Sequence, residues 1–172
     1  AAGYDNNLPD EVKNLKNAEE RKNAAKKTLE GAGYTLNGDF YEKDGKQVTI
    51  GYTMFGDGTN VKNRAAGIQK RCKDAGINLT LDSHPSSEFS EVLTSGNWDV
   101  CLFGWSGNAV SYNNGVQLYG SESASNFGRQ GTAETDALFA KVVSTANFDE
   151  RMKIMNEAEK KCMATYSYLP IY

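Results

Sequence analysis

The most chemically distinctive segment of the sequence is a short polar stretch that directly follows an apolar run at residues 98–103. The run carries no charge after Asp99, which predicts a strand buried on both faces, as in a parallel sheet covered by helices. The stretch after it consists of Gly104, Trp105, Ser106, Gly107 and Asn108. Ligands of open α/β sheets bind beyond the carboxyl ends of the strands, where glycines admit another backbone and a Trp offers flat apolar area. The segment therefore has two interpretations, a ligand-binding surface or a strand end whose Trp covers the core.

A second group that could carry chemistry surrounds His84, the only histidine of the sequence. It is followed by Ser86, Ser87 and Glu88, which together with the imidazole suggest a hydrolytic site. Nucleophilic catalysis needs a base within reach of an activated nucleophile and an oxyanion hole, and no signature such as Gly-x-Ser-x-Gly accompanies these residues. We therefore predict a solvated loop histidine and a protein that is not an enzyme. An enzyme would need a second catalytic group converging on His84 or on a cysteine.

The glycine-rich turn at residues 56–60 precedes a predicted helix and invites comparison with phosphate-binding loops. It lacks the Gly-Lys-Ser/Thr ending of a P-loop and the glycine spacing of a dinucleotide fingerprint. We therefore interpret it as a turn in which Thr59 caps the following helix, and we predict no cofactor.

The three cysteines, Cys72, Cys101 and Cys162, are far apart in the sequence and follow no zinc-binding spacing. Cys101 falls within the predicted strand, and the other two fall on apolar helix faces. Buried, inert and unpaired thiols are therefore expected, and no metal site is predicted.

The elements that position these residues alternate between strands and helices. A helix at 17–30, capped by Asn17 with Glu20 as its partner, precedes a hairpin at 34–45. A strand at 47–55, a helix at 61–75 and a strand at 77–81 follow, and this succession requires a right-handed crossover between parallel neighbours. After the strand at 98–103, a long polar loop at 111–126 precedes two helices, at 133–145 and 149–165. Their inward residues are predicted to be Leu138, Phe139, Val142 and Val143 in the first, and Met152, Met155, Ala158 and Cys162 in the second.

Length and charge limit the class of protein. A chain of 172 residues is long enough for one domain, and its net charge of −3 argues against a nucleic-acid binder. No run approaches the roughly 18 apolar residues of a membrane helix, and the first residues show no signal-peptide pattern. The sequence stops on an apolar run at 168–172, so we expect both ends to lie within a longer protein.

A set of short motifs recurs in a characteristic order along nearly the whole chain. They are Leu29-Glu30-Gly31-Ala32-Gly33-Tyr34, Ala75-Gly76-Ile77, Phe89, Gly96-x-Trp98-Asp99, Gly104-Trp105, Asn126-Phe127, Thr135-Asp136-Ala137-Leu138, Asp149-Glu150-Arg151, Glu157-Ala158-Glu159 and Tyr168-Leu169-Pro170-Ile171-Tyr172. Each is weak alone, but the ordered set resembles the carboxyl-terminal lobe of the extracytoplasmic solute-binding proteins of peptide ABC importers, the oligopeptide, dipeptide and nickel group.

The resemblance implies an α/β fold in which a mixed β-sheet is flanked by helices, one lobe of a type II periplasmic-binding-protein fold. Residues 1–172 would form the carboxyl-terminal, ligand-binding lobe of a larger two-lobed protein whose first lobe lies outside this sequence. Gly104 and Ser106 would offer main-chain groups to a peptide, and Trp105 would pack against a ligand side chain. Many peptide-binding members place an aspartate at position 108 to hold the peptide ammonium, and Asn108 departs from that pattern. The expected ligand-binding residues are Gly104, Trp105, Ser106, Gly107, Asn108 and, from the long polar loop, Tyr112.

The function implied by the resemblance is that of the substrate-binding component of an ABC importer, which binds oligopeptides between two lobes and delivers them to membrane permease subunits. The expected location is extracytoplasmic, in the periplasm or lipid-anchored on the outer face of the cell membrane, with no nucleic-acid partner. Two alternatives remain open: a binder of an oligosaccharide or another non-peptide solute, and a ligand-sensing domain of a signalling protein.

Overall fold

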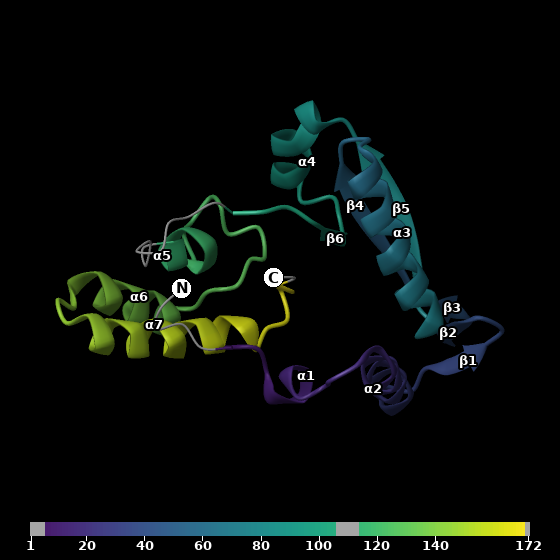
Figure 1. Cartoon of the computed structure of the whole chain (residues 1–172), viewed down its shortest axis with the longest axis horizontal. Helices are drawn as coiled ribbons and strands as arrows, with labels where there is room; N and C mark the ends of the chain where they lie inside the picture. Colours follow the sequence, from purple (N-terminus) through teal and green to yellow (C-terminus); the bar gives the residue numbers. More distant parts are fainter. Residues whose placement is uncertain (1–5, 106–113, 171–172) are drawn as a thin grey trace. The chain divides into compact units, whose positions relative to one another are not determined.

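The computed structural model describes residues 6–105 and 114–170 of the chain. It divides the chain into two compact units, one formed by Ala1–Asn14 with Trp105–Tyr172 and the other by Leu15–Gly104. Figure 1 follows the chain through both units by colour. Ser106, Gly107, Asn108 and Tyr112, four of the expected ligand-binding residues, lie outside the described residues.

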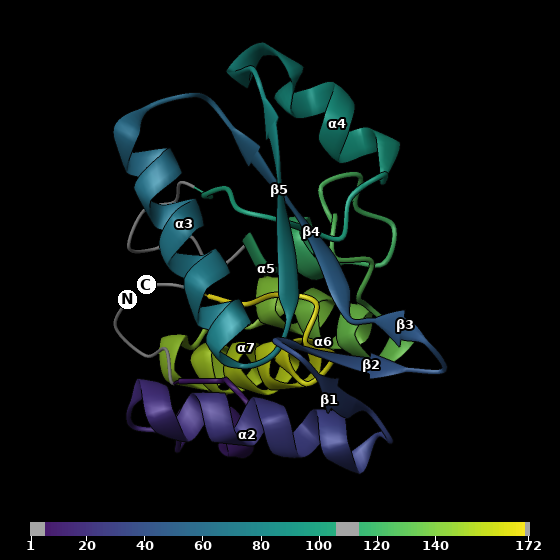
Figure 2. The same cartoon turned by 90° about the vertical axis from the view of Figure 1, so that its right-hand side faces the viewer.

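The unit formed by Leu15–Gly104 is built around a parallel sheet. Its central strand β4 (Thr49–Phe55) pairs with β5 (Asn78–His84) on one side and with β6 (Val100–Cys101) on the other. Helix α3 (Thr59–Asp74) connects β4 to β5 and lies along them (Figure 2), as the predicted crossover requires. The buried core between helix and sheet consists of Tyr52, Met54, Ala65 and Leu79.

Two strands of this sheet differ in length from the prediction. β5 continues to His84, so the histidine ends a strand rather than lying in a loop, and Pro85 then begins the turn into η1 (Ser86–Glu88) and α4 (Phe89–Ser95). β6 contains two residues instead of the predicted six. Trp98 and Asp99 contact neighbouring main chain through their side chains instead of continuing the ladder.

A small antiparallel sheet, β1 (Thr35–Asn37), β2 (Phe40–Lys43) and β3 (Lys46–Gln47), confirms the hairpin predicted at 34–45 and adds a third strand. Buried Tyr41 connects it to its surroundings. The Tyr41 hydroxyl donates to Glu30 of α2 (Ala18–Gly31) at 2.6 Å, and its main-chain N–H donates to the Gly76 carbonyl at 2.8 Å. Asn17 caps α2 as predicted, because its side chain accepts from the Glu20 main-chain N–H at 2.9 Å.

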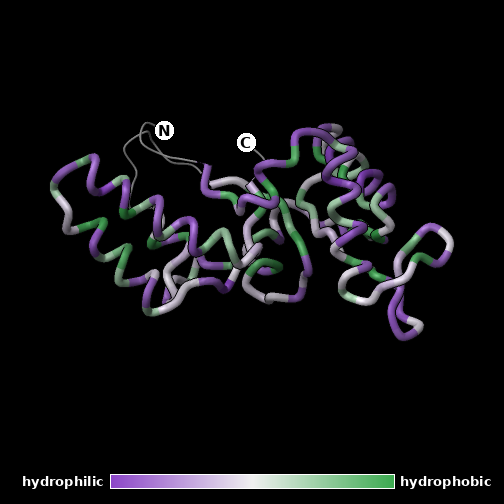
Figure 3. The backbone as a smooth tube through the Cα atoms, turned by 90° about the horizontal axis from the view of Figure 1, so that it is seen from below, coloured by the Kyte–Doolittle hydropathy of each residue, from purple (hydrophilic) through white to green (hydrophobic). Residues whose placement is uncertain are grey.

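The other unit is helical, with α1 (Asp10–Lys13), α5 (Asn114–Tyr119), α6 (Ala133–Ser144) and α7 (Phe148–Met163). Apolar residues recur along α6 and α7 between polar ones (Figure 3), as expected for helices that bury one face. The predicted inward residues Phe139, Val142, Met152, Met155, Ala158 and Cys162 are buried. Val143 was wrongly placed inside: it is 56% exposed, because the residue after Val142 is rotated by about 100° around the helix.

Helix α5 lies where the sequence predicts a continuous polar loop at 111–126. The Asn-Asn-Gly at 113–115 is typical of a turn, but Gly115 has a packing role. A Cβ on Gly115 would lie 2.7 Å from Met155 and from Phe139, so the missing side chain lets α5 approach α6 and α7 closely. No helix in the described part of the chain is long and apolar enough to cross a membrane.

We expect the substitution Gly76→Ala to lower the free energy of unfolding by about 2 kcal/mol or more. Gly76 has a φ of +80°, which disfavours a side chain, and an added Cβ would lie 2.5 Å from the buried Tyr41 ring. Gly67→Ala in α3 is the matched control, because the added Cβ would meet nothing within 4 Å. Alanine is also more favourable than glycine in a helix interior, by about 1 kcal/mol. Urea unfolding checks both, and equal stability of the two variants would contradict the packing role of Gly76.

The three thiols are free, as predicted, and we expect them to react slowly in the folded protein. Burial raises the pKa of Cys101 and of Cys162 to about 11, and it also raises the pKa of Cys72. At pH 8 only about a thousandth of a thiol with that pKa is thiolate, the reactive form. Labelling with a chromogenic disulfide reagent should therefore be much slower than in urea-unfolded protein. The prediction that all three are buried holds for Cys162 alone, because Cys72 and Cys101 are half-buried. Rapid labelling of any of the three in the native state would contradict the expected slow reaction.

Candidate ligand-binding site

Of the expected ligand-binding residues, Gly104 and Trp105 lie in the described part of the chain, and both are exposed. Gly104 is the last residue of the unit containing the parallel sheet, and Trp105 is the first residue of the helical segment of the other unit. Gly104 follows β6, whose carboxyl end shares one edge of the sheet with those of β4 and β5. This is the edge at which ligands of α/β sheets bind.

The start of β6 is held by side chains on both sides. The Trp98 indole N–H donates to the Leu93 carbonyl of α4 at 3.2 Å. The Asp99 carboxylate accepts a hydrogen bond from the Gly51 main-chain N–H of β4 at 2.7 Å. Two anchors of this kind fix the path of a strand that has only two ladder residues, and so they position the segment that leads to Gly104.

The end of β6 is held by three phenylalanines, which we name the aromatic row: Phe55 at the end of β4, Phe89 at the start of α4, and Phe103. Phe55 and Phe89 meet edge to face with centroids 4.9 Å apart, and Phe89 and Phe103 do so at 5.5 Å. This geometry is favourable for aromatic pairs. The row fixes the side chain directly before Gly104 to the ends of two other elements.

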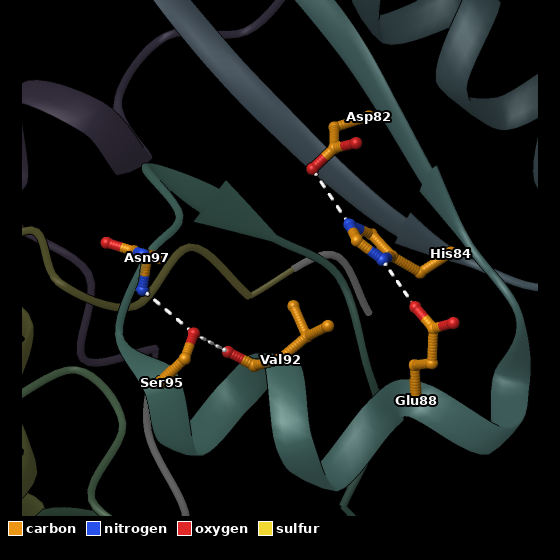
Figure 4. Close-up of polar contacts among 6 residues, drawn as sticks. All are labelled: Asp82, His84, Glu88, Val92, Ser95 and Asn97. Carbon is orange, nitrogen blue, oxygen red and sulfur yellow. Dashed lines mark hydrogen bonds and ion pairs between the residues drawn. The ribbon is translucent and has the colours of Figure 1, made fainter.

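His84 is held between two carboxylates at the same edge of the sheet. Its Nδ1 lies 2.8 Å from Glu88 Oε2, and its Nε2 lies 2.9 Å from Asp82 Oδ2 (Figure 4). The ring is half-buried, so the predicted solvated histidine was wrong: both nitrogens have protein partners. We name Asp82, His84 and Glu88 the His84 clamp, because it joins β5 to the turn before α4.

The two carboxylates raise the pKa of His84 through hydrogen bonding, Glu88 first and then Asp82. A group whose pKa is raised on folding stabilises the fold below its unfolded pKa, and that contribution is lost as pH rises through the raised value. The clamp is therefore strongest in mildly acidic solution. Both ring nitrogens face proton acceptors, an arrangement that holds a cation and leaves neither nitrogen free to activate a nucleophile.

The helix that carries Phe89 ends in a defined turn. Ser95 Oγ donates to the Val92 carbonyl at 2.7 Å and accepts from the Asn97 N–H at 3.1 Å (Figure 4). Gly96 between them adopts the left-handed conformation with φ of +68°, as expected for the glycine that ends a helix. This turn directs the chain from α4 into Trp98 and β6.

In its own unit, Trp105 forms an exposed aromatic surface supported from behind. Its ring stacks on Phe127 with centroids 6.4 Å apart and an interplanar angle of 21°, and the residue remains 38% exposed. Buried Asn126 precedes Phe127 and donates through Nδ2 to the carbonyls of Tyr119 and Gly120, at 3.3 and 3.0 Å, and to that of Gln130. These bonds fix the loop that carries Phe127.

The same loop packs closely on the core of the helical unit. A Cβ on Gly128 would lie 2.7 Å from the Tyr168 ring, so the absent side chain permits this approach. Tyr168 meets Tyr119 edge to face at 5.5 Å, and Tyr119 stacks on Phe139 of α6 at 6.0 Å. Sequence analysis identified Asn126-Phe127 only as a family motif; its supporting role could not be found from local pattern.

A separate open groove lies between α5 and α6, with a volume of about 920 Å³. It is lined by Val116, Gln117, Gly120, Ser121, Glu122, Ser123, Asp136, Phe139, Ala140 and Val143. Gly104 and Trp105 are not in its lining, and we do not assign it to the candidate site. Within residues 6–105 and 114–170, no group of three or more His, Cys, Asp or Glu side chains could hold a metal ion.

Gly104 thus lies beyond the carboxyl ends of parallel strands, the position at which open α/β domains bind ligands. The model of the bacterial extracellular solute-binding proteins, family 5, middle region, matches residues 2–127, and the chain belongs to this family. The oligopeptide-binding protein OppA of Mycobacterium tuberculosis is 29% identical over 148 residues, which are 86% of this chain and 25% of OppA. The chain thus spans about a quarter of the length of that relative.

Solved structures of the same kind share the fold. The oligopeptide-binding protein AppA of Bacillus subtilis, in complex with a nonapeptide, aligns with 98% of this chain and 33% of its own, with a TM-score of 0.77 and 21% identity. The murein tripeptide binding protein MppA of Escherichia coli aligns with 96% of this chain and 31% of its own, with a TM-score of 0.77 and 20% identity. The predicted α/β fold of type II periplasmic binding proteins, in which helices flank sheets, is confirmed. In place of the single mixed sheet that was predicted, the described strands form a parallel sheet and a separate antiparallel sheet.

We expect Asp99→Ala to lower the free energy of unfolding by about 1 kcal/mol, because it removes the acceptor of the Gly51 N–H. Asp57→Ala is the control, since Asp57 is an exposed carboxylate in the turn after β4, with no side-chain partner in the described part of the chain. Urea unfolding monitored by circular dichroism measures both. An Asp99→Ala variant as stable as Asp57→Ala would contradict the anchoring role of Asp99.

Proposed function

We propose that this protein is the substrate-binding component of an ABC importer, and that it binds oligopeptides and delivers them to permease subunits in the membrane. The observation that carries the proposal is the sequence likeness to an oligopeptide-binding protein over 86% of the chain. The exposed Trp105, stacked on Phe127 and directly following Gly104 in the sequence, supports it as a surface suited to a peptide.

Recognition of the peptide rests, in this proposal, on main chain more than on side chains. Gly104 and Ser106 offer main-chain groups to an extended ligand, a form of strand addition that tolerates many peptide sequences. The indole of Trp105 packs against a ligand side chain, while Gly107, Asn108 and Tyr112 complete the surface. Residues 1–172 act as the carboxyl-terminal lobe, and closure of two lobes around a hinge buries the ligand.

The proposal places the protein outside the cytoplasm, in the periplasm or lipid-anchored on the outer face of the cell membrane. We also propose that it is not an enzyme and has no nucleic-acid partner. Both nitrogens of its only histidine engage carboxylates, its net charge is −3, and the relatives named above are binding proteins.

A non-peptide solute, such as an oligosaccharide, is the second candidate ligand. Asn108 favours it, because an amide both donates and accepts hydrogen bonds but carries no charge to hold a peptide ammonium. Native mass spectrometry of the full-length protein as purified distinguishes the candidates by the mass of the bound solute. A carbohydrate mass in place of a family of peptide masses would overturn the proposed ligand, and a fused signalling domain in the full-length protein would favour a sensor.

We expect Trp105→Ala to weaken peptide binding by the full-length protein about tenfold or more, because it removes a flat apolar contact surface of a kind that dominates binding energies. Phe148→Ala is the matched control: Phe148 is an exposed aromatic residue, 44% exposed against 38% for Trp105, at the start of α7. Isothermal titration calorimetry with a mixed peptide library, followed by single peptides, gives the affinities. Unchanged affinity of Trp105→Ala would contradict the assigned contact.

A further inference from the structure

The two carboxylates of the His84 clamp each need an N–H donor from the imidazole, and only the charged imidazole has two. A neutral imidazole has one N–H donor and one acceptor nitrogen, whereas an imidazolium has two donors. Both nitrogens lie within 2.9 Å of carboxylate oxygens, which accept when ionised. Loss of the proton would therefore leave a nitrogen lone pair facing either Asp82 or Glu88, and one of the two bonds would be lost.

Among the residues that the structure describes, Asp82 and Glu88 are the charged groups that act on the ring. Asp82 faces it from β5, and Glu88 faces it from the turn before α4. From β4 the neighbours are the apolar ring of Phe55, with centroids 6.2 Å apart, and the Gly56 main-chain N–H, which donates to the His84 carbonyl at 2.9 Å.

The clamp is connected to the ligand-binding segment through the aromatic row. Glu88 directly precedes Phe89, so the bond to His84 sets the position at which α4 begins. Phe89 contacts Phe55 on one side and Phe103 on the other, and Phe103 directly precedes Gly104. All of these residues belong to the unit Leu15–Gly104. A change in the first turn of α4 therefore reaches the segment after β6 through the Phe89–Phe103 ring contact.

We propose that His84 is a positioning residue whose proton controls ligand binding: the charged ring holds β5 to α4 and keeps the end of β6 in its binding position, and binding weakens when the proton leaves. The inference rests on the proposed function, since the affected segment is the proposed peptide surface. A solute-binding protein with this device captures its ligand best in mildly acidic surroundings.

The direction of the effect follows from the charges of the clamp. The unperturbed pKa of histidine is about 6.5, and the pKa of His84 is raised by Glu88 and Asp82. The bonds to the ring are complete below pH 6.5 and are lost as pH rises through the raised value. Peptide affinity should therefore fall as pH rises through the raised pKa of His84. The substitution Glu88→Gln keeps the shape of the side chain but removes its charge, so it should move this fall in affinity to lower pH.

The test measures peptide affinity of the full-length protein by calorimetry between pH 6 and pH 8.5. We expect the wild type to lose about fivefold over this range, a typical coupling between two sites. His84→Gln should be weak and nearly independent of pH, and Glu88→Gln should lose its affinity earlier. Glu91→Gln is the matched control, because Glu91 lies on the same short helix with no side-chain partner in the described residues, and it should keep the wild-type profile.

A wild-type fall that persists unchanged in His84→Gln would overturn the proposal, as would a flat wild-type profile. A second readout on the wild type alone guards against variants that do not fold: NMR titration of the His84 ring and of the Phe103 ring. Phe103 resonances that follow the His84 titration support the coupling, and resonances that ignore it overturn it. If no peptide binds at any pH, the proposed ligand is wrong, and the coupling is decided by this titration.

Discussion

The parallel pairing of β4 with both of its neighbours is the interaction on which the candidate site depends. Because β4 lies between β5 and β6 and all three run in one direction, their carboxyl ends meet at a single edge. That edge brings together residues far apart in the sequence, among them Phe55, His84 and Phe103. The pairing is seven residues long on one side and two on the other, so the β6 side needs support from side chains.

Hydrogen bonds support β6 at its start, and aromatic contacts support the segment at its end. Asp99 and Trp98 bind main-chain groups of β4 and α4, and Phe103 meets Phe89. A short strand fixed in this way leads to the exposed Gly104 and leaves only a short unpaired edge. On the other unit, Trp105 is likewise exposed over a rigid support, because buried Asn126 holds the loop of Phe127.

Local sequence pattern predicted most features that depend on local chemistry, but the predicted Thr59 cap was wrong, because Thr59 is the first residue of α3 and Gly58 is its N-cap. The crossover from β4 through α3 to β5, the Asn17 cap and the buried face of α7 follow from periodicity and capping residues. The short β6 did not follow, because the bond that replaces its ladder joins residues 51 and 99, which only the fold brings together. For the same reason the partners of His84 and the packing role of Gly115 were missed. Gly104 and Trp105 were identified from their position after a strand, whereas their expected role in peptide binding came from the family resemblance.

The two tryptophans give each compact unit its own optical signal. Trp98 lies in the unit of the parallel sheet, half-buried with its indole N–H bonded to a carbonyl, whereas Trp105 lies in the other unit, more exposed and stacked on a phenylalanine. Their emission spectra should differ, with that of Trp105 at longer wavelength because water reaches its ring. Replacing either indole by phenylalanine leaves a single tryptophan, which can be excited selectively over the nine tyrosines. The unfolding of each unit can then be followed separately and without an attached dye.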